Sequence, residues 1–175
     1  YLFPAVVLAS GKKLSPSARQ LEALQALLVA VFGTDAACEF AKQPDAVGAF
    51  PIHAVTVANT EEAIKMAELL FMSNPDLLKQ VHTKHRAGFP LFTGESSLHI
   101  CCVNRREALL CKLIDLMMDR FTAEEARALL GSQAGGVFFN EMPMRNYGGT
   151  PLAYAACFGL RRAVDGWRCN DLLIS

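Results

Sequence analysis

Apolar residues recur every three or four positions in several stretches of the chain, a spacing that places them on one face of a helix. The spacing is clearest over Glu61–Met72 and Arg106–Asp119, where charged residues fill other positions. An upstream stretch, Arg19–Val31, shows the same spacing after Ser15-Pro16, a common helix start. The pattern predicts an all-α protein.

Three short segments of the chain align with one another without gaps. They are Phe50-Pro51-Ile52-His53-Ala54-Val55, Ser96-Ser97-Leu98-His99-Ile100-Cys101 and Thr150-Pro151-Leu152-Ala153-Tyr154-Ala155. Each fits imperfectly the pattern Thr-Pro-Leu-His-x-Ala. In that pattern Ser or Thr caps a short helix, and Pro occupies the first helical position, where a backbone N–H would have no acceptor within the helix. The His side chain can form a hydrogen bond back across the turn. The shared positions that define the motif here are Pro51, His53, Ser96, Leu98, His99, Thr150, Pro151 and Leu152.

Small residues follow each segment, and Asn59, Asn104 and Gly159 then end the predicted short helix. The longer stretches Glu61–Met72 and Arg106–Asp119 come next as outer helices. A short inner helix followed by a longer outer one is the ankyrin unit. The fold we expect is therefore an ankyrin repeat solenoid.

The repeats are further apart than usual. Equivalent positions Pro51, Ser97 and Pro151 lie 46 and 54 residues apart, against about 33 in typical ankyrin repeats. The finger loops, which connect one repeat to the next, must therefore be enlarged. The first is predicted to carry a short helical stretch from Pro75, and the second a helix that starts at a capping box over 122–125 and ends near Leu130.

A length of 175 residues fits one domain. We divide it into residues 1–47, capping helices or a degenerate repeat, and residues 48–175, about three ankyrin repeats. The last repeat is expected to be incomplete, because Asp165-Gly166 and the residues after it interrupt the apolar pattern.

Composition excludes several classes of protein. Hydrophobic residues make up 52% of the chain and the net charge is 0, so neither a disordered chain nor a nucleic-acid binder is indicated. The apolar runs Tyr1–Ala9 and Ala26–Phe32 are shorter than the roughly 20 residues of a transmembrane helix. Six cysteines lie in apolar, helix-patterned stretches, which favours buried thiols in a reducing compartment such as the cytosol.

The candidate catalytic and metal-binding groups all have structural explanations. His99, Cys101 and Cys102 lack zinc-site spacing. His82 and His85 stand among basic residues, as in a solvated loop. The glycines over 131–136 lack the Gly-Lys-Ser/Thr ending of a phosphate-binding loop. We therefore expect no enzyme, no cofactor and no metal site.

Two groups of motifs are more specific than a generic ankyrin repeat. The first is Phe92-Thr93-Gly94-Glu95-Ser96-Ser97-Leu98-His99-Ile100, followed by Asn104-Arg105-Arg106. The second is Gly136-Val137-Phe138-Phe139, followed by Tyr147-Gly148-Gly149 and the third segment. Over residues 48–159 the chain resembles the ankyrin domain of vanilloid-type transient receptor potential (TRPV-like) cation channels.

The resemblance implies a cytosolic regulatory domain at the inner face of a membrane. It would contact protein partners or neighbouring subunits of a tetrameric channel, whose calcium-permeable pore lies elsewhere in the parent chain. Some family members bind ATP or calmodulin, but Phe92, Glu95 and Val103 are apolar or acidic, so ATP and calmodulin binding are not expected. One alternative is a soluble ankyrin adaptor that binds a protein partner, and another is an enzyme with an ankyrin appendage.

Aromatic residues in the finger loops are the candidate contacts, because aromatics are enriched at the centres of protein interfaces. They could equally pack against one another and stiffen the fingers. Our candidate binding residues are Phe89, Phe92, Arg105, Phe138, Phe139 and Tyr147.

Overall fold

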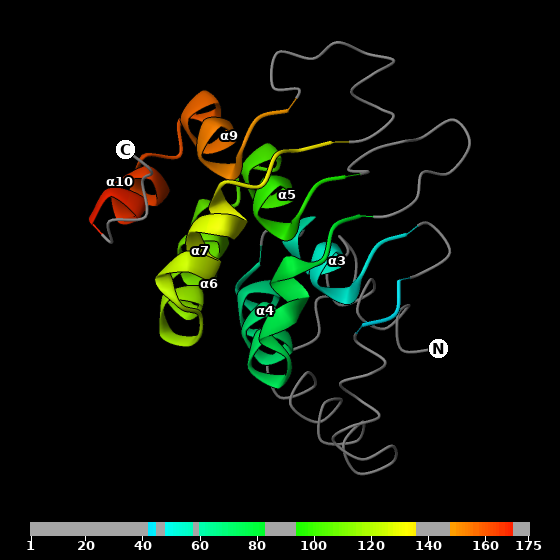
Figure 1. Cartoon of the computed structure of the whole chain (residues 1–175). Helices are drawn as coiled ribbons and strands as arrows, with labels where there is room; N and C mark the ends of the chain where they lie inside the picture. Colours follow the sequence, from blue (N-terminus) through cyan, green and yellow to red (C-terminus); the bar gives the residue numbers. More distant parts are fainter. Residues whose placement is uncertain (1–41, 45–47, 58–59, 83–93, 136–147, 170–175) are drawn as a thin grey trace, which may run out of the picture.

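The computed structural model describes residues 42–44, 48–57, 60–82, 94–135 and 148–169 (Figure 1). Within these residues the regular structure is helical, and the only extended pairing is an isolated antiparallel bridge between Val81 and Ser96. The prediction of an all-α protein is confirmed for this part of the chain. The helix predicted over Arg19–Val31 lies outside it, as does the rest of the predicted N-terminal unit 1–47 apart from residues 42–44.

Six of the described helices form three pairs of a short helix and a following helix. The pairs are α3 (Pro51–Val57) with α4 (Glu61–Ser73), α5 (Ser97–Val103) with α6 (Glu107–Arg120), and α9 (Pro151–Phe158) with α10 (Arg161–Cys169). The short helices contact one another in the order α3, α5, α9, and the following helices contact one another in the order α4, α6, α10. Figure 1 shows the two rows side by side.

Side-chain caps fix where several helices begin and end. The Thr150 hydroxyl accepts the Ala153 amide at the start of α9, and the Asn104 amide group donates to the Ile100 carbonyl at the end of α5. Gly159 ends α9 in the left-handed conformation, with φ of 72°. These three predicted boundaries are confirmed, whereas Asn59 lies outside the described residues.

The described part of each insertion contains a helix, as predicted. A 3-10 helix, η1 (Pro75–Lys79), follows α4, and the Asn74 side chain accepts the Asp76 amide at its start. The helix α7 (Ala123–Leu130) lies against α6. Its capping box joins the Thr122 hydroxyl to the Glu125 amide at 3.2 Å and the Glu125 carboxylate to the Thr122 amide at 3.0 Å.

The core runs between the two rows and continues from the first pair to the last. Its members are mostly aliphatic and aromatic side chains, together with methionines and the thiols of Cys101 and Cys102. The largest fully buried ones include Ile52, Phe71, Leu77, Leu98, Leu110, Leu113, Met117, Tyr154 and Trp167. Each helix pair therefore contributes side chains to one continuous core.

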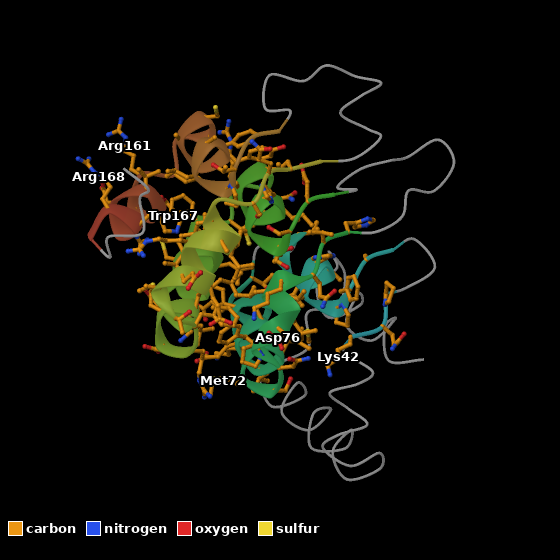
Figure 2. The ribbon with its side chains drawn as sticks, in the orientation of Figure 1. Lys42, Met72, Asp76, Arg161, Trp167 and Arg168 are labelled. Carbon is orange, nitrogen blue, oxygen red and sulfur yellow. The ribbon has the colours of Figure 1, made fainter. Side chains whose placement is uncertain are left out.

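The predicted interruption after Gly159 is wrong. The helix α10 continues through Asp165-Gly166 to Cys169, and Leu160, Ala163 and Trp167 are buried at intervals of three and four residues. The indole of Trp167 has no exposed surface. In Figure 2 Arg161 and Arg168 extend away from the helix rows. Burial of this indole, in a helix that contacts α6 and α9, outweighs the low helix propensity of one glycine.

The prediction of buried thiols holds only in part. Cys101 and Cys102 are buried and Cys111 is partly buried, but Cys157 is exposed on α9. All four are free thiols. Among the described helices, none has both the length and the apolar character needed to cross a membrane.

Candidate functional site

The described ends of the two finger loops are joined by backbone hydrogen bonds. His82 and Gly94–Glu95 bond to each other at 2.8 and 3.0 Å, and Ala134 bonds to Gly148 and Gly149 at 3.2 and 2.9 Å. The Gly135 amide donates to the Gly94 carbonyl at 3.3 Å and links the two sets. We call residues 82, 94–95, 134–135 and 148–149 the stem ladder. In Figure 1 the coloured ends of both loops leave the helices on the same side.

Gly94 is the tightest point of the stem ladder. Its φ of +79° lies in the left-handed region, and a Cβ atom added to it would lie 0.9 Å from the Gly135 carbonyl oxygen. Only glycine fits this position.

Two histidines of the short helices, His53 and His99, each contact a backbone carbonyl in the insertion that follows their helix. The Phe50 amide donates to His53 Nδ1 at 3.3 Å, and His53 Nε2 lies 3.1 Å from the Gln80 carbonyl. The Ser96 amide donates to His99 Nδ1 at 3.2 Å, and His99 Nε2 lies 3.2 Å from the Gly149 carbonyl. Because one nitrogen accepts and the other meets a carbonyl, each ring is neutral with its proton on Nε2. The predicted bond back across the turn is confirmed at both positions.

The third helix pair departs from this arrangement. Ala153 stands where the first two pairs have histidine, and it is exposed. The Thr150 hydroxyl still caps α9, so the helix start survives without the histidine.

Glu95 places a carboxyl group inside the protein between α5 and α9. Its exposed fraction is 3%, and the Tyr154 hydroxyl donates to its Oε1 at 3.2 Å. Among the described residues, Oε2 has no hydrogen-bond partner. Burial raises the pKa of Glu95 from 4.5 to about 7, against the lowering effect of the tyrosine hydrogen bond.

Burial also keeps the neighbouring groups neutral. It lowers the pKa of His53 and of His99 from 6.5 to about 4, and hydrogen bonds to backbone carbonyls only partly oppose this. Burial raises the pKa of the Cys102 thiol well above its usual value, with a further contribution from Glu95. The surroundings of the stem ladder therefore carry buried polar groups but little charge.

The sequence Asn104-Arg105-Arg106 forms the turn between α5 and α6. Arg105 has a φ of 53°, the one positive value among the described residues other than glycine. Its guanidinium lies 6.0 Å from the centre of the Phe158 ring on α9. Arg106 donates from both Nε and Nη2 to the Val57 carbonyl, at 3.1 Å each. The turn thus reaches the helix pairs on either side.

Lys79 connects the two insertions. Its ammonium lies 2.8 Å from Asp76 and 3.1 Å from Glu125, and 4.9 Å from the centre of the Phe121 ring. The hydrogen bonds that the ammonium donates to Asp76 and to Glu125, in that order of effect, raise the pKa of Lys79. The Glu125 pair joins η1 to α7, whereas the Asp76 pair lies within η1.

Most of the candidate binding residues fall outside the described part of the chain: Phe89, Phe92, Phe138, Phe139 and Tyr147. Arg105 is described and is exposed at the turn. The motif positions lie as expected at the starts of the short helices, with Pro51, Pro151 and Leu98 buried and Leu152 partly buried.

One expectation about this region is wrong. His82 is 7% exposed and its ring stacks on His53 with centroids 5.9 Å apart, so it does not belong to a solvated loop. His85 lies outside the described residues. No group of three or more His, Cys, Asp and Glu side chains within the described ranges could hold a metal ion.

Glu95, Gly94 and Arg106 were not recognised from the sequence as residues that organise the site. The one available signal was their position beside the Ser-Ser-Leu-His segment and the Asn-Arg-Arg turn. No protein-family model matches the chain, and no curated protein matches it.

Proposed function

We propose that residues 48–175 are ankyrin repeats that bind protein, and that they form the cytosolic regulatory domain of a TRPV-like, calcium-permeable cation channel subunit. The observation that carries the proposal is the stem ladder. It brings the ends of two long loops to one side of three successive helix pairs. Loops held on a rigid scaffold are where binding residues concentrate.

The histidine contacts support the ankyrin part of the proposal. His53 and His99 each accept a backbone amide at the start of their own helix and place Nε2 against a backbone carbonyl of the insertion that follows, at Gln80 before the first finger and at Gly149 after the second. The same use of a histidine in two successive helix pairs supports a repeated unit.

The channel part of the proposal rests on the resemblance of the motifs. Gly94, Arg105 and Arg106 each have a specific structural use here, in the stem ladder and in the turn that joins neighbouring helix pairs. These residues belong to the sequence stretches that resemble the second repeat of those channels. In this reading the finger residues Phe138 and Phe139 contact a partner or a neighbouring subunit.

The second candidate is a soluble ankyrin adaptor, and the same scaffold would serve it equally well. The full coding sequence around residues 1–175 separates the two. The channel proposal expects further helix-pair repeats and several apolar runs of about 20 residues downstream. A complete reading frame without such runs would overturn the channel proposal and leave the adaptor.

A further inference from the structure

The seam between α5 and α9 buries two titratable side chains next to one tyrosine. Glu95 precedes α5, His99 lies within α5, and both contact Tyr154 of α9. Their exposed fractions are 3% and 1%. The carboxyl bonds to the tyrosine hydroxyl, and the imidazole meets the tyrosine ring edge-on with centroids 5.1 Å apart.

Geometry makes each of the two groups neutral while the seam is closed. His99 Nδ1 accepts a backbone amide and therefore carries no proton, while Nε2 faces the Gly149 carbonyl and carries one. Within the described residues the Glu95 carboxyl has one hydrogen bond, no bond to a cationic side chain, and a bare Oε2. A carboxylate there would be a buried charge without a counterion.

The other groups around the seam are neutral or already engaged. From α5 the Cys102 thiol lies nearby and donates to the Pro151 carbonyl at 3.5 Å. From the stem ladder His82 donates its backbone amide to the Glu95 carbonyl, and behind it His53 of α3 is neutral. At the start of α6, Arg106 binds the Val57 carbonyl.

We propose that Glu95 and His99 are a matched neutral pair whose opposed proton linkages make the docking of α9 and α10 independent of pH. When the seam opens near pH 5 to 6, the Glu95 O–H bond breaks and an N–H bond forms at His99 Nδ1, with no net exchange of protons with solvent. The open state carries a carboxylate and an imidazolium, both hydrated.

The size of each linkage follows from the two shifts. For Glu95, opening becomes easier as pH rises, because its pKa is about 7 when closed and 4.5 in solvent. For His99, opening becomes easier as pH falls, because its pKa is about 4 when closed and 6.5 in solvent. The two effects nearly cancel between about pH 4 and about pH 8.

Amide hydrogen exchange of α9 and α10 in the full chain, corrected for the intrinsic exchange rate, measures this opening. Wild-type protection should change by less than about threefold from about pH 5 to about pH 8. Over the same range, Glu95→Gln should gain about 30-fold in protection and His99→Gln should lose about 70-fold. Glu124→Gln, a variant of an exposed carboxylate on α7, should follow the wild type.

A Glu95→Gln profile as flat as the wild-type profile would overturn the proposal. A carboxyl-carbon NMR titration of the unmodified protein gives a second test that needs no variant. Glu95 should titrate near neutral pH, and titration near its solvent value of 4.5 would equally overturn the proposal.

Discussion

The amide of Gly135 donates to the carbonyl of Gly94 at 3.3 Å, and this contact leaves no room for a side chain on Gly94. Gly94→Ala would place Cβ 0.9 Å from the Gly135 carbonyl oxygen at a φ of +79°. The two loop ends would have to separate. We expect a loss of more than about 3 kcal/mol in the free energy of unfolding, measured by denaturant titration.

Gly135→Ala is the matched control for that prediction. A Cβ atom on Gly135 meets nothing within 4 Å, so this variant should stay within about 0.5 kcal/mol of the wild type. Equal free energies of unfolding for the two variants would contradict the close approach of Gly94 to Gly135 in the stem ladder.

The two neutral histidines outweigh Glu95 in the pH dependence of global stability. Their pKa values are lowered to about 4, so their contribution is present above pH 6.5 and is lost as pH falls through about 4. Glu95 acts oppositely, since its contribution is present below 4.5 and is lost as pH rises through about 7. Two histidines against one carboxyl leave a net loss of about 3 kcal/mol on acidification from about pH 7 to about pH 4.

Denaturant unfolding across this pH range checks the prediction. His53→Gln leaves one histidine against one carboxyl, so its stability should depend much less on pH than that of the wild type. A variant with the same acid-induced loss as the wild type would show that His53 is not held neutral.

Arg105 and Gly159 occupy equivalent places, each in the left-handed turn that follows a short helix. A positive φ strains the backbone of an arginine but not that of a glycine. The contact between the Arg105 guanidinium and the Phe158 ring offsets part of this strain. Arg105→Gly should therefore raise the free energy of unfolding by about 0.5 kcal/mol. Arg127→Gly makes the same exchange inside α7 and should lower it by about 1 kcal/mol.

If Arg105→Gly and Arg127→Gly lower the free energy of unfolding by the same amount, the backbone is not left-handed at Arg105. If Arg105→Gly is more stable and also binds partners less well, the arginine is retained for binding at a cost in stability.

Trp167 is the one tryptophan of the chain and has no exposed surface. Its fluorescence should therefore report a buried indole and shift to the red when α10 leaves α6. Trp167→Ala should lose about 3–5 kcal/mol in unfolding free energy, whereas the exposed neighbour Arg168→Ala should stay within about 0.5 kcal/mol of wild type. A solvent-exposed emission spectrum in native buffer would contradict a docked α10.

Local chemistry made much of the fold predictable. The outer helices were expected over Glu61–Met72 and Arg106–Asp119 and are observed at Glu61–Ser73 and Glu107–Arg120. The capping box at Thr122 and the terminator Gly159 act within a few residues of their own helices. The residues that form such a cap or helix end lie next to one another in the sequence, so the sequence alone predicts them.

Contacts between distant parts of the chain were not predictable in the same way. The Tyr154–Glu95 bond joins residues 59 apart, and Arg106 reaches a carbonyl 49 residues away. The helix α10 was missed because Asp165-Gly166 is unfavourable locally and is overridden by the burial of Trp167. These outcomes depend on which helices meet, which one sequence does not specify.

The central claim, that the fingers carry protein recognition, is tested most directly by Phe138→Ala/Phe139→Ala in the full-length protein. Co-capture of a differently tagged copy, with a melting curve recorded in parallel, separates binding from folding. We expect co-capture to fall several-fold while the melting temperature moves by less than about 4 °C. Unchanged co-capture beside an unchanged melting curve would contradict the claim.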